Sequence, residues 1–477
     1  MASQTAKKVS HNYDFDITII GSGPGGYESA IRATQLGFKT CIVEKELNLG
    51  GVCLNWGCIP TKSLLKNAEV IHTINHASEF GIKVDKMEIN FTEVIRRSRK
   101  VATKMAKGVE FLMKKNAITV KKGYGKLKSA HEIQITDEKD GKSETITSLH
   151  TILATGSKAR SIPTVQVDRE RIITSYEAMI LKEKPETLTI IGAGAIGCEF
   201  AYFYNAVGTK VTIIELMPHI LPNEDDEIAV VLTREFKKQG IAALTEAKVE
   251  KTEVRDKKVY TTVLLKDGTK KELESDYALV AIGLGGNIEN LGIEDIGVKT
   301  NRGFIEIDSF GRTTVEGVYA IGDVAGGMLL AHKASAEGII CIEKIAGLNP
   351  EPLDPMSIPA CTYCQPSVAH IGLTEAQTKE KGYEIKVGKF PFSASGKASA
   401  AGHPEGMVKL IFDTKYGELL GAHIIGHEAT EMIAELGIAK KLEATSEWIH
   451  KTVHAHPTFS EAVKEAAAAA DGEAINI

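Results

Sequence analysis

The sequence has no apolar run close to the roughly 20 residues that a bilayer-spanning helix requires, so it predicts no membrane span. It also has no excess of positive charge. Its 57 basic and 62 acidic side chains give a net charge of −5, whereas binding to nucleic acid requires a basic face. Residues 1–16 have neither the apolar region of a signal peptide nor the Arg-rich pattern of a transit peptide. We therefore expect a cytoplasmic protein that does not act on nucleic acid.

Cysteine is also sparse. Seven cysteines scattered over 477 residues do not form the framework of a small secreted domain. In a reducing compartment most of them should be free thiols, and a disulfide there is more often catalytic than structural. The chain is too long for one ordinary core, so we expect two to four domains.

A strand–loop–helix–strand pattern occurs twice. In the first copy an apolar strand runs into the glycine-rich loop 21–26, and the next strand ends at Glu44. In the second copy the loop is 192–197, and the next strand ends at Glu215. Each acid comes 18 positions after the last glycine of its loop, close to the spacing of about 20 in dinucleotide-binding βαβ units. Two such matches in the same context predict two dinucleotide-binding units.

The loop glycines permit a tight turn, let the backbone approach a pyrophosphate, and let helix and strand pack closely. They are Gly21, Gly23 and Gly26 in the first copy and Gly192, Gly194 and Gly197 in the second. The helix that follows presents N–H groups to the phosphates. A carboxylate at the end of the second strand accepts a hydrogen bond from a ribose 2′-OH and repels a 2′-phosphate. Glu215 therefore predicts NAD rather than NADP, and Glu44 fits the ribose of a second dinucleotide.

The rest of the chain has a different pattern in each part. Between the two units lie a mainly helical region, 62–115, and a β-rich segment, 117–151. After the second unit, the strand 318–323 brings Asp323 to its C-terminal edge, and the helix 332–346 follows. From about residue 359, strands alternate with helices and no glycine-rich loop occurs. The C-terminal part is therefore a third kind of domain.

Two cysteines stand just after the first unit. Cys53 and Cys58 are five positions apart, which in a regular helix separates their Cα atoms by about 8.6 Å, beyond the bridging limit of about 7 Å. A disulfide therefore requires a distorted turn, which Gly57 and Pro60 favour, and such a strained bridge is easily reduced. The alternatives are two buried thiols or a metal pair. A metal site would need further Cys or His residues nearby, and none lies close in sequence.

A cycling thiol pair needs a base, and the segment 451–461 contains one candidate. His456 can accept a proton from a dithiol near neutral pH, and the Glu461 carboxylate could hold its other ring nitrogen. Pro457 suits the first position of a helix, which predicts Glu461 just past one turn into that helix. The spacing fits equally well two surface histidines, His454 and His456, before a helix.

Together these motifs resemble the pyridine nucleotide-disulfide oxidoreductase family, and especially its members that oxidise dihydrolipoyl groups with NAD. The likeness extends from about Asp14 to Lys464. It is carried by the segment from Cys53 to Cys58, the strand end Gly322-Asp323, the segment 330–338, and His454 to Thr458 with Glu461. No metal ion is expected.

The resemblance implies an α/β fold with two Rossmann-like dinucleotide-binding domains, for FAD and NAD, and an α+β C-terminal dimerisation domain. The expected borders are 1–158 for the first part of the FAD-binding domain, 159–281 for the NAD-binding domain, 282–350 for a central segment that completes the FAD-binding domain, and 351–477 for the dimerisation domain. FAD would contact Gly21, Gly23, Gly26, Glu44, Lys62, Gly125, Thr155, Gly156, Ser157, Asp323 and Ala331. NAD would contact Gly192, Ala193, Gly194, Ala195, Ile196, Gly197, Glu215, Val249 and Gly283.

The resemblance also implies roles in catalysis. Cys53 would exchange with the substrate dithiol, and Cys58 would lie against the flavin as a thiolate. Lys62 would lie near the reactive nitrogen of the flavin and pair with Glu199. The base, His456 held by Glu461, comes from the partner subunit in this family, so we expect a homodimer. The expected protein partners are lipoyl domains of 2-oxoacid dehydrogenase acyltransferases or the carrier protein of glycine cleavage.

Two features differ from the family pattern or have no role in it. The run Leu284-Gly285-Gly286-Asn287 stands where the family usually has basic residues and a proline, which leaves the nicotinamide-side loop undefined. Cys361 and Cys364 flank Thr362-Tyr363, and we interpret them as thiols on a strand of the last domain; the alternative is a second redox pair.

Related activities fit the sequence less well. Glutathione and trypanothione reductases use NADP and need basic residues where Glu215 stands. Mercuric reductases and high-molecular-weight thioredoxin reductases need a C-terminal cysteine pair, and no cysteine follows Cys364. A flavoprotein with only an assembly role would be expected to lose the cysteines or His456, and all are present.

Overall fold

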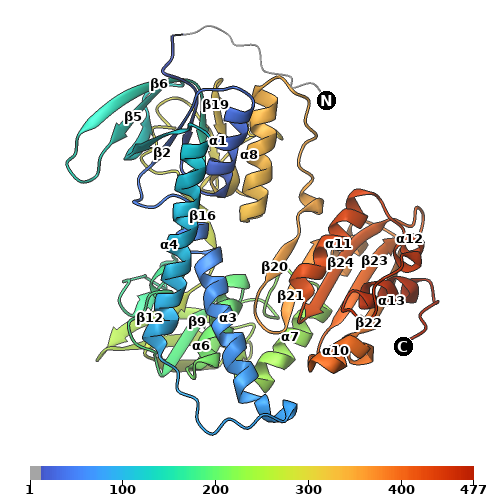
Figure 1. Ribbon diagram of the computed structural model, residues 1–477. Helices are drawn as coiled ribbons and strands as arrows, with labels where there is room; N and C mark the ends of the chain where they lie inside the picture. Colours follow the sequence, from blue (N-terminus) through green and yellow to red (C-terminus); the bar gives the residue numbers. More distant parts are fainter. Residues whose placement is uncertain (1–11) are drawn as a thin grey trace. The chain divides into compact units, whose positions relative to one another are not determined.

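The computed structural model describes residues 12–477, which form two compact units (Figure 1). The first unit consists of the described part of Met1–Ser63 together with Ile95–Arg160 and Gly283–Leu353. The second consists of Leu64–Val94, Ser161–Ile282 and Asp354–Ile477. The expected lack of a targeting peptide concerns mainly residues 1–11, which lie outside the described residues. Over residues 12–477, no helix combines the length and apolar character that crossing a membrane requires.

A seven-stranded sheet forms the centre of the first unit, in the order β3-β2-β1-β6-β5-β4 with β19 also paired to β6. The strands are β1 (Phe15–Ile20), β2 (Thr40–Glu44), β3 (Thr119–Lys122), β4 (Tyr124–Leu127), β5 (Glu132–Thr136), β6 (Ser143–Leu153) and β19 (Val318–Ala320). β1, β2, β3, β6 and β19 run parallel, while β4 and β5 are antiparallel. The carboxyl ends of the parallel strands therefore meet at one edge, which is where ligands bind in open α/β sheets.

Two helices, α1 (Pro24–Gln35) and α8 (Ala331–Ile345), pack together on one face of this sheet (Figure 1). Almost every residue of β1 is buried, as expected for a parallel strand that is covered on both faces. The two helices approach closely because small residues line their contact. A Cβ atom on Gly338 would lie 2.0 Å from the Ser29 hydroxyl, so a larger residue there would force the helices apart.

The second unit contains a five-stranded parallel sheet in the order β11-β10-β9-β15-β8. Its strands are β8 (Ile172–Ile173), β9 (Thr187–Ile191), β10 (Lys210–Ile214), β11 (Ala242–Leu244) and β15 (Tyr277–Val280). The helices of this region are α5 (Ser175–Ala178), α6 (Ala195–Ala206) and α7 (Asp226–Lys238). An antiparallel sheet of β12 (Lys248–Arg255), β13 (Lys258–Leu264) and β14 (Lys270–Ser275) precedes β15. The parallel strands and the helix that follows β9 form the second predicted βαβ unit.

The C-terminal part of the second unit is an antiparallel sheet in the order β20-β21-β24-β23-β22. Its strands are β20 (Ala360–Thr362), β21 (Ser367–Gly372), β22 (Ile385–Pro391), β23 (Met407–Asp413) and β24 (Leu419–Gly426). Its helices are α9 (Glu375–Glu380), α10 (Gly396–Ala401), α11 (Ala429–Lys441), α12 (Ser446–Lys451) and α13 (Glu461–Ala470). α11 packs on β21 and β24, and α13 packs on β22 and β23. One core of buried aliphatic and aromatic side chains joins these elements.

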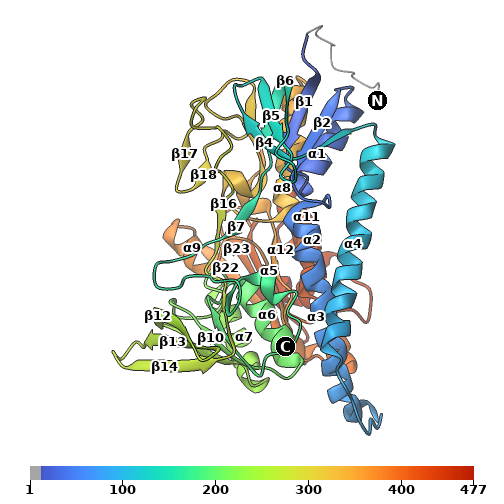
Figure 2. The same cartoon turned by 90° about the vertical axis from the view of Figure 1, so that its left-hand side faces the viewer.

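The predicted helical region, 62–115, contains most of α3 (Cys58–Asn75), the 3₁₀ helix Ala77–Phe80, and α4 (Phe91–Lys115), and a short helix, α2 (Gly51–Asn55), precedes it. Figure 2 shows the antiparallel sheet of β12, β13 and β14 in the second unit. The first unit also has two short ribbons, β7 (Ser157–Ala159) with β16 (Leu284–Gly286), and β17 (Thr300–Asn301) with β18 (Phe304–Ile305). The architecture confirms the predicted fold class, while the borders between the four domains stay a prediction.

Candidate active site

Both glycine-rich loops lie between the end of a parallel strand and the start of a helix. At Gly21, φ is +109° and a Cβ atom would lie 2.2 Å from a backbone oxygen. At Gly192, φ is +100° and the distance would be 2.5 Å. Only glycine fits either position. The N-cap residues of α1 and α6, Gly23 and Gly194, make no side-chain capping bond, so both helix N-termini suit a phosphate. A Cβ atom on Gly194 would meet no atom within 4 Å, so open space lies beside this loop.

Glu44 and Glu215 make the same contacts in their own units. Each is only 7 % exposed. The Glu44 carboxylate accepts hydrogen bonds from the N–H of Ser22 at 2.9 Å and from the N–H two positions after Glu44 at 2.9 Å. The Glu215 carboxylate accepts them from the N–H of Ala193 at 2.7 Å and from the N–H two positions after Glu215 at 2.9 Å. Each acid is therefore fixed against its own glycine loop at the carboxyl edge of the sheet.

A third group of predicted residues lies where β6 and β19 end. The Ser157 hydroxyl donates a hydrogen bond to the Asp323 carboxylate at 2.6 Å, and burial raises the pKa of Asp323 despite this bond. Asn287 closes the same turn. Its side-chain amide donates to the Thr155 carbonyl at 3.0 Å, and its backbone N–H donates to the Gly156 carbonyl at 2.9 Å. Sequence reasoning did not assign Asn287 to this turn, because only pairing of β16 with β7 brings it there.

The departure at Leu284 to Asn287 thus has a structural reason. Leu284–Gly286 forms β16, which pairs antiparallel with β7 beside the Thr155–Ser157 turn. A Cβ atom on Gly286 would lie 2.7 Å from the Gly303 carbonyl oxygen, so glycine permits this close backbone approach.

The segment 330–338 supports the turn that carries Asp323. Lys333 is buried, at 6 % exposed, and forms an ion pair with Glu337 at 2.9 Å. The other oxygen of Glu337 accepts a hydrogen bond from the Gly322 N–H at 2.8 Å. Ala331 begins α8, whose N-cap makes no side-chain capping bond. The motif that carried the resemblance therefore fixes the position of the Asp323 turn.

The remaining predicted contacts are placed as follows. Gly125 lies in β4 against β1 and β2, where a Cβ atom would be 3.1 Å from the Val43 side chain. Val249 lies in β12 with its side chain in the core. Ala195 and Ile196 open α6. Gly283, at φ +106°, falls in the first unit, whereas the other predicted NAD residues fall in the second. Their contacts with a cofactor stay predictions.

The segment with the two cysteines interrupts a helix, as the spacing required. α2 and α3 are separated at Trp56 and Gly57, so Cys53 and Cys58 lie on different helices. Trp56 has φ −141°, and a Cβ atom on Gly57 would lie 3.3 Å from the Cys53 Cα atom. The two thiols are in hydrogen-bonding contact, and this contact is the largest cause of the raised pKa of Cys53. The break therefore brings together two sulfurs that a regular helix would separate.

A positive charge lies beside this pair. The contact with Cys58 and burial raise the pKa of Cys53, whereas the ammonium group of Lys62 lowers it. Lys62 is on α3 in the first unit, and Glu199 is on α6 in the second. Glu199 is 5 % exposed and accepts a hydrogen bond from the N–H of Tyr363 at 3.1 Å. The pairing of Lys62 with Glu199 stays a prediction.

Two arginines of α4 hold the cysteine segment on both sides of Cys58. The Arg99 guanidinium donates a hydrogen bond to the Asn55 carbonyl at 2.6 Å. The Arg97 guanidinium donates to the Ser63 hydroxyl at 2.7 Å and to its carbonyl at 3.1 Å. Sequence reasoning missed both arginines, because their contacts join residues 34 and 44 positions apart.

His456 and Glu461 are in contact. The Nδ1 atom of His456 lies 2.8 Å from one Glu461 oxygen, and the other oxygen accepts a hydrogen bond from the Thr458 N–H at 2.8 Å. Burial raises the pKa of Glu461, but the bonds from Thr458 and His456 outweigh it, so the pKa is lowered. The His456 side chain is 80 % exposed. The imidazole is thus anchored at one nitrogen, and most of its surface remains accessible.

The prediction that Pro457 begins a helix is wrong. α13 begins at Glu461, and the His456–Pro457 peptide bond is cis. The Glu461 carboxylate binds the N–H of Thr458, three positions earlier, and so closes a turn at 457–460 where helix was expected. Glu461 is therefore the first residue of the helix instead of lying one turn inside it.

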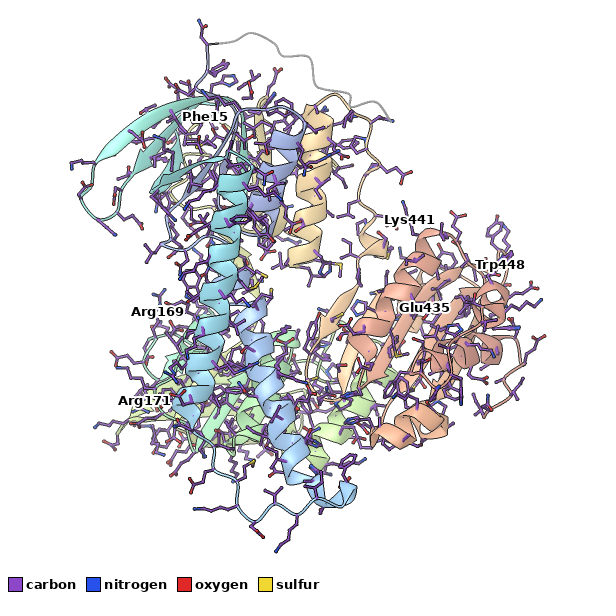
Figure 3. All side chains as sticks on the ribbon, viewed as in Figure 1. Phe15, Arg169, Arg171, Glu435, Lys441 and Trp448 are labelled. Atoms are coloured by element: carbon purple, nitrogen blue, oxygen red, sulfur yellow. The ribbon has the colours of Figure 1, made fainter. Side chains whose placement is uncertain are left out.

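The neighbouring His454 has a different environment. Its side chain is only 6 % exposed, and Nε2 lies 2.6 Å from Glu435 of α11, which Figure 3 labels. The hydrogen bond that the His454 ring donates to the Glu435 carboxylate raises the pKa of His454. The two histidines are thus not an equivalent surface pair: His454 ties the segment to α11, and His456 is exposed.

Cys361 and Cys364 were both expected on a strand of the last domain, but only Cys361 lies in one. Cys361 lies in β20 and is half-buried, while Cys364 follows β20 and is fully buried. The Cys364 thiol donates to the Pro366 carbonyl at 3.3 Å, and burial raises its pKa well above the ordinary value. Such a thiol forms little thiolate, so it is a poor nucleophile.

The predicted residues divide between the units. The FAD set lies in the first unit, together with Cys53, Cys58 and Lys62. The NAD set, apart from Gly283, lies in the second unit with Glu199, His456 and Glu461. Each predicted cofactor thus has its own glycine loop, its own acid and its own parallel sheet.

Comparison with known families decides the classification. The pyridine nucleotide-disulphide oxidoreductase family matches residues 15–338, and the dimerisation domain of the same family matches 358–467. The chain belongs to the pyridine nucleotide-disulphide oxidoreductase family. The predicted family is thereby confirmed, and the match to the dimerisation domain supports a homodimer.

Relatives of this family member share nearly its whole length. A dihydrolipoyl dehydrogenase of Chlorobaculum parvum is 48 % identical, over 97 % of this chain and 98 % of its own. The dihydrolipoyl dehydrogenase of Bacillus subtilis is 43 % identical, over 97 % and 99 %. These relatives confirm the predicted class of enzyme, an oxidoreductase similar to dihydrolipoyl dehydrogenases.

Solved structures agree with the fold. LpdA from Mycobacterium tuberculosis superposes with a TM-score of 0.88 at 26 % identity, covering 94 % of this chain and 98 % of its own. The flavoprotein disulfide reductase RclA from Escherichia coli, solved as a Cu(II) complex, gives a TM-score of 0.86 at 25 % identity and covers 96 % and 99 %.

Proposed function

We propose that this protein oxidises protein-bound dihydrolipoyl groups through a Cys53–Cys58 disulfide and transfers the electrons by way of FAD to NAD. The observation that carries the proposal is the contact between the two thiols across the break between α2 and α3. A reversible disulfide needs two sulfurs in contact on a backbone that does not have to move far. The names of the full-length relatives support dihydrolipoyl as the substrate.

The residues present fit two dinucleotide cofactors. In the first unit, FAD would be held by the uncapped N-terminus of α1, by Glu44, by the Thr155–Ser157 turn and by Asp323. In the second, NAD would be held by the uncapped N-terminus of α6 and by Glu215, with open space beside Gly194. The negative charge of Glu215 disfavours NADP. When bound, the two cofactors supply transfer of an electron pair and acceptance of a hydride.

The protein's own residues carry the thiol chemistry. A thiolate of the substrate attacks the Cys53 sulfur of the disulfide, forming a mixed disulfide, and Cys58 leaves as a thiolate. The second substrate thiol loses its proton to His456 and displaces Cys53, which releases the oxidised, cyclic disulfide and leaves the enzyme as a dithiol. The positive charge of Lys62 near Cys53 favours the thiolate form in this segment. Glu461 anchors the imidazole so that one ring nitrogen remains available to the substrate.

We propose further that the active enzyme is a homodimer, because in this family the base faces the cysteines of the other subunit. In that arrangement His456 of the partner subunit serves Cys53 of the first subunit. The dihydrolipoyl group would be delivered by the lipoyl domain of an acyltransferase or by a glycine-cleavage carrier protein in the cytoplasm.

An assay of the purified holoenzyme tests the proposal. The protein should be yellow and should reduce NAD⁺, but not NADP⁺, with dihydrolipoamide. Replacing Cys53 or Cys58 by serine should lower turnover by at least about 10³-fold, because no disulfide can form. The matched control is Cys361→Ala, which should retain nearly full turnover. Turnover that survives in Cys58→Ser overturns the proposed mechanism, and loss of turnover in Cys361→Ala would indicate a second redox pair.

A further inference from the structure

Helix α4 is strongly basic in an acidic protein. Between Phe91 and Lys115 it has eight Lys or Arg and two Glu residues, a net charge of +6. The whole chain has a net charge of −5, so the rest of the chain carries −11. The buried face of the helix is apolar and consists of Phe91, Ile95, Ala102, Ala106, Val109 and Met113. The positive charges therefore gather on the opposite, exposed side.

Four of these charges form a row, which we call the basic strip. It consists of Arg96, Lys100, Lys104 and Lys107, all exposed and spaced four, four and three positions apart. This spacing places them on one helix face. The same residues, with Arg99 and Thr103, line a shallow surface hollow. Among the described residues, no carboxylate forms an ion pair with any of the three lysines, so their charge is not neutralised within the chain.

The basic strip lies directly beside the cysteine segment. Arg99, between two members of the strip, donates to the Asn55 carbonyl, and Arg97 donates to Ser63. Asn55 and Ser63 flank Cys58 in the sequence. All of these residues belong to the first unit. A macromolecule bound to the strip would therefore lie on the helix that holds the cysteine segment in place.

We infer that the basic strip of α4 is a docking surface for a carboxylate-rich face of the protein that carries the dihydrolipoyl group. The inference rests on the proposed function and specifies how its protein substrate is recognised. A dithiol on a flexible side chain reaches Cys53 only if the body of its carrier protein binds nearby. A row of unneutralised ammonium groups attracts an acidic carrier and raises its association rate.

Other partners fit the strip less well. A second copy of the chain whose twofold axis crossed the strip would place the same positive row opposite it, and like charges would repel. Nucleic acid would meet a molecule whose remaining surface is strongly negative. An acidic protein domain that binds transiently needs only a small patch, and four basic residues on three turns of a helix provide one.

Kinetics with two forms of the substrate test the inference. The triple variant Lys100→Glu, Lys104→Glu, Lys107→Glu is compared with the wild-type holoenzyme. One substrate is a recombinant lipoyl domain of an acyltransferase in its reduced form, and the other is free dihydrolipoamide. At low ionic strength kcat/KM for the domain should fall by about 10-fold or more, through loss of steering, while that for free dihydrolipoamide stays within about 2-fold. Added salt should lower kcat/KM for the domain in the wild type and have little effect in the variant.

The matched control is the triple variant Lys128→Glu, Lys139→Glu, Lys299→Glu, which makes the same change in charge at exposed positions of the first unit. It should resemble the wild type with both substrates. Unchanged kinetics with the domain in the strip variant overturn the inference, and so does an equal loss with both substrates, which would assign the strip to the chemistry itself. Equal losses in the control and strip variants overturn it as well, because net charge alone would then explain the effect. If the wild-type enzyme oxidises neither substrate, both the inference and the proposed function are wrong. The other outcomes test the inference alone and do not contradict the proposed function.

Discussion

At the scale of single residues, His456 and its neighbour His454 should differ in their effect on turnover, because only His456 is proposed to act as a base. A general base contributes about 10²–10⁴-fold to rate, so His456→Gln should lower kcat with dihydrolipoamide by about 10²-fold or more. Glu461→Gln keeps the shape but removes the charge that holds Nδ1 at 2.8 Å, and we expect about a 10-fold loss. The matched control is His454→Gln, which should lower thermal stability and leave kcat within a few-fold. Equal losses of kcat in His454→Gln and His456→Gln would contradict the assignment.

The two buried acids allow a second comparison at this scale. Glu215→Gln removes the negative charge that repels a 2′-phosphate, so the ratio of kcat/KM for NADP⁺ to that for NAD⁺ should rise by about 10-fold. Glu44→Gln makes the same change in the same local geometry of the first unit. It should weaken FAD retention, measured by flavin fluorescence after gel filtration, and leave the nucleotide ratio unchanged. The assignment of the two cofactors is reversed if Glu44→Gln changes the nucleotide ratio and Glu215→Gln releases flavin.

At the scale of elements, α13 approaches β22 most closely at Gly388. A Cβ atom on Gly388 would lie 1.8 Å from the Ala466 carbonyl oxygen, so Gly388→Ala must push helix and strand apart. Overpacking of this kind costs about 1–3 kcal/mol, and we expect the urea midpoint of unfolding to fall accordingly. The control is Gly396→Ala in α10, where a Cβ atom would meet nothing within 4 Å. A midpoint for Gly388→Ala that equals that of Gly396→Ala would show that the packing of α13 is looser than the structure has it.

At the scale of the whole molecule, one buried lysine joins distant parts of the second unit. Lys409 of β23 is 1 % exposed and lies 2.8 Å from Asp225, 2.7 Å from Glu227 and 2.8 Å from Glu375. Lys409→Met leaves the buried Asp225 carboxylate without its lysine, whereas Glu227 and Glu375 keep Lys389 and Lys379. Loss of one partner of a buried ion pair costs about 3–5 kcal/mol of the free energy of unfolding at pH 7. Lys415→Met, at an exposed position of the neighbouring turn, should cost little.

The same cluster predicts a pH dependence. Hydrogen bonds from Lys379 and Lys409 lower the pKa of Glu375 from its ordinary value of 4.5 to about 2. A carboxyl group whose pKa is lower in the folded state stabilises the protein above the unfolded value and loses this effect as the pH falls. The contribution of Glu375 should therefore be complete above pH 4.5 and disappear toward pH 2. Urea unfolding at several pH values should show the cost of Lys409→Met shrinking over this window. A constant cost from pH 7 to pH 2 would exclude Glu375 as its source.

The sequence by itself determined the features that depend on local spacing. These local patterns are the loop glycines, the acids at the ends of the second strands, and the two cysteines beside Gly57. Residues such as Gly21, Glu44 and Cys58 could therefore be found without coordinates. The fold class followed from the same patterns, because a repeated strand–loop–helix unit permits few arrangements.

Only the tertiary structure decided the contacts between distant segments. The turn of Thr155 is closed by Asn287, the cysteine segment is held by Arg97 and Arg99, and Glu461 begins a helix where Pro457 was expected to do so. The first contact depends on the pairing of β16 with β7, and the second depends on the packing of α4. The third arises because the Glu461 carboxylate accepts a hydrogen bond from the Thr458 N–H, so residues 457–460 form a turn instead of the first turn of a helix. Local propensity does not determine such contacts, because their free energy comes from groups that only the folded chain brings together.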